Sequence, residues 1–244
     1  MYFEIMIYAF NDYFLLWKPR GVPSTFWEEK SLLDYLEIPW ELGKLLIEST
    51  DTKILSTYVD VSQYTKFEDV KWFENNQRTQ FSRKQEYGLL NRLDNATGGF
   101  LYFAKTPQAY TNYRAFQKQG RIQKTYLAFV EGNPCYKDEG KLIDIYFPIM
   151  HLASNPEKMI VVKWYQDENK WRGKRHKWKT SVELIKYFPE EQKSLVKVTI
   201  SKWIRHQIRA HLATIGAPIL GDILYNKKAK KEDLQLWSVW FSME

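Results

Sequence analysis

Alternating side chains predict a β-strand over residues 124–131. Tyr126, Ala128 and Val130 share one face of this strand, because successive side chains of a strand point to opposite faces. Apolar runs bounded by turn residues predict further strands. They cover residues 13–17, 100–104, 159–164, 180–187 and 194–200.

Capping residues delimit one predicted helix. Thr106 is a suitable N-cap, Pro107 suits the first helical position, and Gly120 suits the position just past the end of a helix. These signals predict a helix over residues 107–119.

A second helix is predicted over residues 204–215, because apolar residues recur there at helical spacing. They are Ile204, Ile208, Leu212 and Ile215. Gly216 ends this helix. Arg205 and Arg209 lie four residues apart on an adjoining stripe, so Arg209 would lie beside the apolar seam. Two solvated arginines on the flank of a helix are the alternative interpretation.

The rest of the chain carries weaker signals. Residues 31–36 and 40–47 have helical patterns, whereas residues 48–88 show no period. No internal repeat or low-complexity linker divides the chain, so we expect a single domain over residues 1–244. The predicted strands outnumber the helices and interleave with them without a βαβ period, which favours the α+β class.

Composition excludes several classes of protein. The 244 residues are 44% hydrophobic and 16% aromatic, which is enough apolar area to exclude a disordered chain. Cys135 is the only cysteine, so an internal disulfide and a cysteine zinc cluster are excluded. No apolar run reaches the roughly 18 residues of a membrane span, and residues 1–10 lack a basic leader and a cleavage site. We therefore expect a soluble, cytoplasmic protein.

Charge and aromatic content point to a polyanionic partner. The chain has 36 Lys and Arg against 29 Asp and Glu, a net charge of +7, together with ten Trp and sixteen Tyr. Rings beside cations are what stacked bases and phosphates need. Residues 170–179 hold six cations and two Trp, with Lys174, Arg175 and Lys177 at the centre. This run predicts a surface that binds RNA phosphates. A hairpin tip kept soluble by its charges is the alternative.

One carboxylate stands out beside a glycine turn. Asp94 follows Arg92 and Leu93 and precedes Thr97-Gly98-Gly99, where backbone can approach a ligand closely. An Asp at such a place also serves as a turn cap, so this signal alone does not identify a catalytic group. His206 and His211 lie five residues apart, unlike a helical zinc pair, and no carboxylate cluster accompanies them. We therefore predict no metal site.

Four ordered motifs resemble the RluA-type pseudouridine synthase family. Residues 91–99, Asn-Arg-Leu-Asp-Asn-Ala-Thr-Gly-Gly, are similar to the central motif His-Arg-Leu-Asp-x-x-Thr-Ser-Gly. Residues 18–21 resemble Lys-Pro-x-Gly, and residues 124–128 resemble the strand motif Lys-x-Tyr-x-Ala. Residues 206–225, from His-Gln-Ile-Arg-Ala-His-Leu to Gly-Asp and Tyr, resemble the third motif. The resemblance covers residues 13–241, outside 28–88.

The resemblance implies a pseudouridine synthase fold. This fold is α+β, a largely antiparallel mixed sheet flanked by helices, with a central catalytic cleft. It also implies cofactor-free isomerisation of uridine to pseudouridine in ribosomal or transfer RNA, by a monomer. The RNA-binding domain that precedes the catalytic domain in some relatives is expected to be absent, because Lys18 lies so near the start.

The resemblance also implies roles for individual residues. Asp94 would be the catalytic carboxylate, acting on the ribose or the uracil ring of a flipped uridine, and Arg209 would pair with it. Tyr126 would stack on the target base and help move a proton. Arg92 would fill the gap that the base leaves. The apolar walls that exclude water would be Ile208 and Leu212.

The motifs depart from the family at several positions. Asn91 and Gly98 replace His and Ser, and Leu236-Trp237-Ser238 replaces Leu-His-Ala. Trp203-Ile204-Arg205 replaces Gly-Arg-x, so Arg205 would take over the RNA contact of the missing arginine.

Two other functions compete with an active synthase. One is a catalytically silent RNA-binding pseudoenzyme, acting as an RNA chaperone or assembly factor. Retention of Asp94, Tyr126 and Arg209 together favours the active enzyme over it. The other is a glycoside or nucleoside hydrolase, which commonly needs a second flanking carboxylate, and none stands out.

Overall fold

The computed structural model describes residues 3–9, 12–18, 20–21, 24, 53–59, 88–134, 142–162, 171–231 and 233–243. The chain forms two compact units, Met1–Gln119 and Gly120–Glu244. The helices predicted at 31–36 and 40–47 lie outside the described residues. The assignment of the whole chain to one domain stays a prediction.

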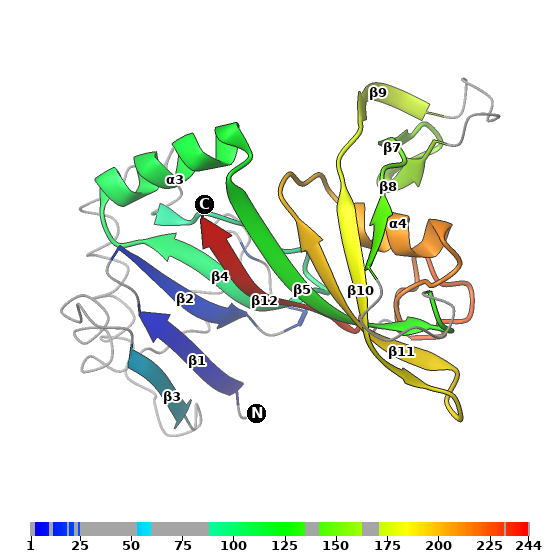
Figure 1. Ribbon diagram of the computed structural model, residues 1–244, viewed down its shortest axis with the longest axis horizontal. Helices are drawn as coiled ribbons and strands as arrows, with labels where there is room; N and C mark the ends of the chain where they lie inside the picture. The colour runs from blue at the N-terminus through cyan, green and yellow to red at the C-terminus, as the bar shows by residue number, and fades with distance from the viewer. Residues whose placement is uncertain are drawn as a thin grey trace. The chain divides into compact units, whose positions relative to one another are not determined.

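The first unit is built on four antiparallel strands (Figure 1). They are β1 (Phe3–Ala9), β2 (Tyr13–Lys18), β3 (Lys53–Val59) and β4 (Gly98–Ala104), in the order β3-β1-β2-β4. Every residue of β4 is buried. Helix α3 (Pro107–Gln119) packs beside β4. The Thr106 hydroxyl accepts the Ala109 N–H at 3.1 Å, and Gly120 has φ +75°, which confirms both predicted ends of this helix.

The second unit contains a five-stranded antiparallel sheet in the order β12-β5-β11-β10-β6. Its strands are β5 (Ile122–Glu131), β6 (Leu142–Ile145), β10 (Thr180–Phe188), β11 (Lys193–Ile200) and β12 (Leu236–Met243). Burial alternates along the whole of β5, with Tyr126, Ala128 and Val130 buried. The predicted strand and the shared face of Tyr126, Ala128 and Val130 are therefore confirmed, and the structure shows this face to be the buried one.

A separate three-stranded sheet in this unit has the order β8-β7-β9. Its strands are β7 (Ile149–Leu152), β8 (Asn155–Val161) and β9 (Trp171–His176). Strand β8 begins four residues before the predicted one. Residues 171–176 of the basic run form β9 paired with β7, so this part of the run is a strand and not a hairpin tip. Binding of RNA by its charges stays a prediction. Helix α4 (Gln207–Thr214) packs on this sheet, and Ala210 shares a core with Ile149, Met159 and Val161.

Helix α4 begins three residues later than its apolar spacing predicts. His206 has φ +56°, a left-handed conformation that a helix cannot continue through, and the first helical bond runs from Ala210 N–H to the His206 carbonyl at 2.9 Å. Ile204 and Arg205 therefore precede the helix. The predicted placement of Arg205 on a helical stripe with Arg209 was wrong, and its side chain is exposed.

The end of α4 follows the prediction. Gly216 at φ +82° donates to the Ala213 carbonyl, and Ala217 donates to the Leu212 carbonyl, which is the Schellman pattern. Within each unit the strands pair antiparallel and the described helices pack against them, which confirms the α+β class. None of the described helices is long and apolar enough to cross a membrane.

Candidate active site

Asp94 lies in a tight turn of the first unit, just before β4. The Thr97 N–H donates to the Asp94 carbonyl at 2.9 Å and closes the turn. The Asp94 side chain is half-buried, whereas the Arg92 side chain is exposed. Gly99, the second residue of β4, has φ +109°, a conformation that favours glycine. Both functional and capping interpretations of Asp94 fit this turn, so its role depends on what surrounds it.

The Lys-Pro-x-Gly segment and Ser24, which follows it, hold this turn from two sides. The Lys18 ammonium donates to the Asn95 carbonyl at 3.1 Å, and the Gly21 N–H donates to the same carbonyl at 2.8 Å. On the other side, the Ser24 hydroxyl donates to the Leu93 carbonyl at 2.7 Å and accepts the Leu93 N–H at 3.1 Å. The backbone on both sides of the carboxylate is therefore fixed by sequence-distant groups, as a preorganised site requires.

Lys18 adds a buried cation to this turn. Its side chain is fully buried, and burial lowers its pKa to about 7, because removal from water disfavours the ammonium. The negative charge of Asp94 acts in the opposite direction and favours the ammonium. The charge of Asp94 thus offsets part of the effect of burial on the Lys18 ammonium.

The segment before Asp94 is anchored to β4 and α3. The Asn91 amide oxygen accepts the Tyr102 N–H at 2.7 Å, and its NH2 donates to the Phe100 carbonyl at 3.3 Å. The Arg114 guanidinium donates to the carbonyls of residues 89 and 90, both at 3.1 Å. Asn91, where the family motif has His, therefore satisfies buried backbone groups.

Arg209, in the second unit, forms a buried ion pair with Asp222. Its side chain is 6% exposed and that of Asp222 is fully buried. Nε donates to Asp222 Oδ2 at 2.9 Å and Nη2 donates to Oδ1 at 2.7 Å, so the pair is bidentate. Asp222 also accepts the N–H groups of Leu224 and Tyr225, at 3.1 and 3.2 Å. The pairing of Arg209 with Asp94 stays a prediction.

Asp222 is a site residue that sequence reasoning missed. Its signal was the Gly221-Asp222 pair in the third motif, which follows the helix by a short loop. Residues 218–220 run beside the end of β5, since Glu131 donates to the Pro218 carbonyl and Leu220 donates to the Phe129 carbonyl. This contact places Asp222 against helix α4, where its carboxylate meets Arg209.

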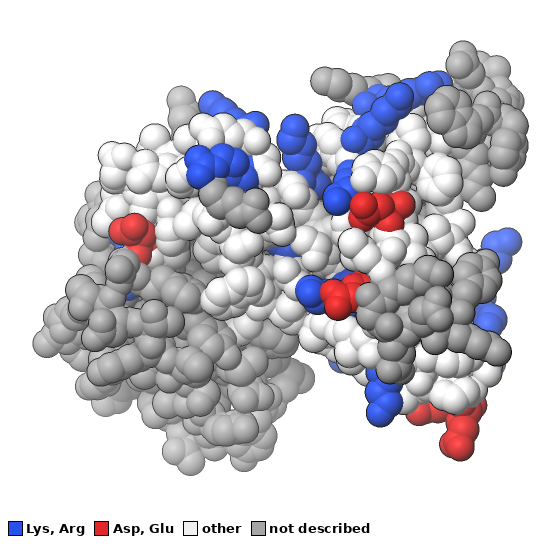
Figure 2. Space-filling model, in the orientation of Figure 1, with Lys and Arg blue, Asp and Glu red and all other residues white. Residues whose placement is uncertain are grey.

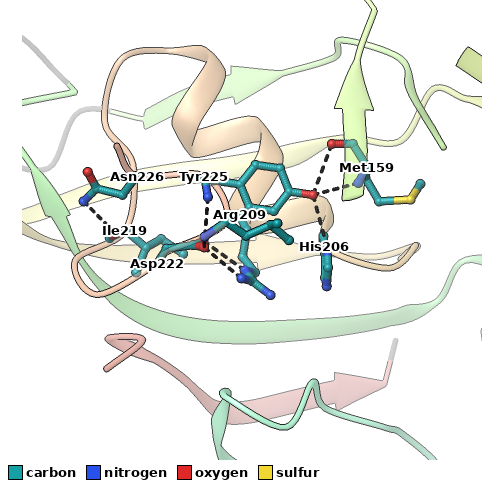
Figure 3. Close-up of polar contacts among 8 residues, drawn as sticks. Met159, His206, Arg209, Ile219, Asp222, Tyr225 and Asn226 are labelled. Atoms are coloured by element: carbon teal, nitrogen blue, oxygen red, sulfur yellow. Dashed lines mark hydrogen bonds and ion pairs between the residues drawn. The ribbon is translucent and has the colours of Figure 1, made fainter. Parts of the chain in front are cut away.

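Tyr225 joins three parts of this unit (Figure 3). Its hydroxyl contacts the backbone N and O of Met159 on β8, at 2.9 and 3.1 Å, and the His206 Nδ1 at 3.1 Å. The Arg209 guanidinium carbon lies 5.3 Å from the centroid of its ring. Tyr225 belongs to the third sequence motif, but the sequence alone assigns it no role.

Tyr126 lies on the inner face of β5 and is buried, opposite Val198 of β11 and Ser238 of β12. Lys124, two residues earlier on the same face, is also buried, and its ammonium lies 3.3 Å from the centroid of the Trp203 ring. A ring over an ammonium stabilises the buried cation. Trp203, which stands where the family motif has Gly, therefore covers a lysine beside Tyr126 on the strand.

The predicted basic surface follows β9 and the residues after it. Arg175 and Lys177 are exposed. The rings of His176 and Trp178, which follow these two cations in the chain, pack edge to face with their centroids 4.9 Å apart. Lys174 lies on β9, with its side chain outside the described residues. Figure 2 shows Lys and Arg side chains gathered over this part of the unit, at the upper right. Cations thus alternate with rings along one exposed edge.

Comparison with protein families decides the assignment. A family model described as RNA pseudouridylate synthase matches residues 12–214. The chain belongs to this family. This match covers the turn of Asp94, the strand of Tyr126 and the helix of Arg209, and it confirms the resemblance drawn from the four motifs.

Individual RNA pseudouridylate synthases give the same result. The chain is 29% identical over 157 residues to the ribosomal large subunit pseudouridine synthase D of Zymomonas mobilis, covering 64% of this chain and 45% of that protein. It is 26% identical over 234 residues to an uncharacterized RNA pseudouridine synthase of Helicobacter pylori, covering 93% and 66%. The chain spans about half the length of the first of these relatives.

Solved structures of pseudouridylate synthases show the same fold. Human RNA pseudouridylate synthase domain containing 1 superposes with a TM-score of 0.62 at 17% identity, over 99% of this chain and 78% of that one. Human RNA pseudouridylate synthase domain containing 4 gives 0.59 at 18% identity, over 95% and 80%. The predicted pseudouridine synthase fold is therefore confirmed.

The predicted site residues divide between the two units. Asp94 and Arg92 belong to the first unit. Helix α4 brings together Arg209 and the buried side chains of Ile208 and Leu212 in the second. His211 lies in the same helix with a structural role. Its Nδ1 lies 2.7 Å from the Thr180 hydroxyl and its Nε2 lies 2.9 Å from the Phe147 carbonyl, and burial lowers its pKa.

A metal site is not formed by the residues that the structure describes. No three His, Cys, Asp or Glu side chains among them could hold an ion together. His211 donates its Nε2–H to the Phe147 carbonyl, and its Nδ1 lone pair accepts from the Thr180 hydroxyl, so both ring nitrogens are engaged.

Proposed function

We propose that this protein isomerises uridine to pseudouridine in ribosomal or transfer RNA, with Asp94 as the catalytic carboxylate. The observation that carries this proposal is the half-buried Asp94 in a turn held on both sides by Lys18, Gly21 and Ser24, within a chain of this family. A carboxylate in a rigid turn keeps the position that attack on a nucleoside requires.

The reaction moves one glycosidic bond. The bond from the ribose carbon to N1 of uracil breaks, a bond from that carbon to C5 forms, C5 loses its proton and N1 gains one. Asp94 would act on either the ribose carbon or the uracil ring, and both routes conserve atoms and charge without a cofactor. The uridine must first leave its stack, at a cost of a few kcal/mol.

The second unit supplies candidate groups for the flipped uridine. Tyr126 would stack on the uracil and take part in moving the proton, and Arg209 would stabilise the carboxylate of Asp94. Ile208 and Leu212, buried on the same helix as Arg209, would exclude water. Arg92, exposed in the first unit, would occupy the gap in the RNA, and the exposed Arg205 would contact its backbone.

Replacement of Asp94 by Asn tests the catalytic assignment. The amide keeps the shape of the side chain but cannot act as nucleophile or base, so turnover should fall below about a hundredth of wild type while RNA affinity stays within a few-fold. Mapping of pseudouridine in total RNA, from cells with and without the protein, identifies the substrate on which turnover is measured. Asp12→Asn, an exposed position in the same unit, is the matched control.

The outcomes separate the two functional classes. Substantial turnover in Asp94→Asn would refute the catalytic role of this carboxylate. RNA binding without conversion in the wild-type protein would identify an RNA chaperone or assembly factor instead.

The salt dependence of RNA binding tests the basic surface. Replacing Lys174, Arg175 and Lys177 with Ala should weaken binding to all RNAs alike and flatten the plot of log K against log salt by roughly 0.7–0.9 per lost phosphate contact. Ala at Lys227, Lys230 and Lys231, exposed lysines outside the run, is the matched control for lost charge. An equal slope change in both triple variants would mean that only net charge matters.

A further inference from the structure

We propose that Tyr225 is a positioning residue, which fixes the Arg209 guanidinium relative to strand β8. This inference rests on the proposed function, because it assigns Arg209 a task in the isomerisation. It goes beyond that function by identifying how the basic three-stranded sheet and the arginine are held together (Figure 3).

The Tyr225 hydroxyl uses all of its bonding capacity in the second unit. A hydroxyl has one hydrogen and two lone pairs. Here it donates to the Met159 carbonyl at 3.1 Å and accepts the Met159 N–H at 2.9 Å. The remaining lone pair meets the His206 Nδ1 at 3.1 Å, so that nitrogen must carry a proton. The hydroxyl therefore links β8 to the start of α4.

The ring and backbone of Tyr225 contact the ion pair. The Arg209 guanidinium carbon lies 5.3 Å from the ring centroid, within the range of a cation–π contact. The Tyr225 N–H donates to Asp222 Oδ1 at 3.2 Å, the same oxygen that accepts from Arg209 Nη2. Tyr225 thus contacts Arg209 through its ring and Asp222 through its backbone N–H. A displacement of Tyr225 would therefore displace both members of the ion pair.

His206 carries backbone strain at the same contact. Its φ of +56° is left-handed, which is unfavourable for a residue with a Cβ and persists only where the surroundings impose it. The His206 ring meets the Tyr225 ring edge to face, with centroids 5.7 Å apart and an interplanar angle of 87°. The hydroxyl and the ring of Tyr225 together hold the left-handed conformation of His206, the residue directly before helix α4.

Strand β8 brings the basic surface into the same contact. Lys158, which precedes Met159, is partly exposed, and its ammonium lies 5.2 Å from the centroid of the Tyr225 ring. Strand β7 joins β8 to β9, the strand of Lys174 and Arg175. An RNA held by β9 is therefore linked through two strand pairings and Tyr225 to Arg209.

Two substitutions separate the contributions of hydroxyl and ring. Tyr225→Phe removes the clamp on β8 and His206 but keeps the ring, whereas Tyr225→Leu removes both. Single-turnover rates at saturating RNA should fall about tenfold in Tyr225→Phe and about a hundredfold in Tyr225→Leu, because small misplacements of a catalytic group cost that much. The dissociation constant for RNA should stay within about threefold. Tyr146→Phe, at a 60% exposed tyrosine of the same unit, is the matched control.

A second readout is independent of activity. The Nε–H of Arg209 is buried and bonded to Asp222, so its NMR signal should exchange slowly with solvent in the wild-type protein. Arg209→Lys identifies the signal by its loss. Exchange should be faster in both Tyr225 variants and unchanged in Tyr146→Phe, at a temperature where thermal melts show every variant folded.

The outcomes distinguish failure of this inference from failure of the proposed function. If the wild type converts uridine and both Tyr225 variants do so at the same rate, the positioning role of Tyr225 is overturned. The proposed synthase activity is then unaffected. If the wild type converts no RNA, the proposed function falls and the exchange measurement decides alone. Unchanged exchange in both variants would then overturn the positioning role.

Discussion

The two charges of the Arg209–Asp222 ion pair should be strongly coupled in their effect on the free energy of unfolding. Loss of either partner alone should be much more destabilising than half of the loss of both. Both side chains are desolvated and the contact is bidentate, at 2.9 and 2.7 Å. Removing one partner leaves an uncompensated buried charge, which costs about 3–5 kcal/mol. Arg209→Met and Asp222→Asn should each lower the free energy of unfolding by that amount.

The double variant should lose far less than the sum. Asn at 222 keeps an oxygen for the N–H groups of Leu224 and Tyr225, so the remaining loss in the double variant is an amide NH2 without a partner, about 1–3 kcal/mol, plus lost packing at 209. The interaction free energy from the cycle should therefore exceed about 2 kcal/mol.

Urea denaturation of all four proteins, with two probes to check two-state unfolding, measures this cycle. The pair of Lys197 with Glu183 is the control, because its atoms lie 2.8 Å apart but its side chains are 45% and 37% exposed. Its coupling should be no more than about 1 kcal/mol. Equal coupling in the two cycles would refute the reasoning, since it would show that burial adds nothing to the pair at Arg209.

Two further variants test features of the two units. Burial lowers the pKa of Lys18 to about 7 from 10.5, so the unfolded chain binds more protons between these values and stability should rise across that pH window. The full rise in the free energy of unfolding should be on the order of 4–5 kcal/mol, and Lys18→Met should lack it. Urea titrations of both proteins from pH 7 to 10.5 measure this difference. The same pH dependence of stability in both proteins would contradict the prediction. Gly221→Ala should cost more than about 3 kcal/mol, since a Cβ at φ +72° would overlap the Asp233 backbone. Gly216→Ala, at φ +82° with open space, should cost only about 1–2 kcal/mol, and similar losses at both glycines would count against the overlap.

Local signals were sufficient where an element is specified by its own residues. The ends of α3 are set by Thr106 and Gly120, each one residue from the helix, and both ends were predicted correctly. The inner face of β5 follows from strict alternation, because a slip by one residue would move Tyr126 to the other face. The Schellman end of α4 is likewise local.

Contacts between distant residues decided the features that were not predicted. The start of α4 depends on the left-handed His206, whose ring and Nδ1 contact Tyr225, 19 residues away. Asp222 reaches Arg209 only because residues 218–220 run along β5. Strands β7 and β9 are defined by their pairing with each other, and β9 has the composition of a solvated loop. The partners of these contacts lie 13 or more residues apart, which is beyond the range of helix or strand periodicity.

The order of strands around β5 has a consequence for synthesis on the ribosome. Strand β5 pairs with β11 on one side and with β12 on the other, and both follow it late in the chain. At roughly 5–20 residues per second, β5 leaves the ribosome on the order of 5–20 s before residue 243 does. Until β11 has emerged, both edges of β5 lack their strand partners, and the edge toward β12 stays open until residue 243 follows. The five-stranded sheet is therefore completed only after the nascent chain has released β12, and β5 is the segment for which we expect chaperones to compete during translation.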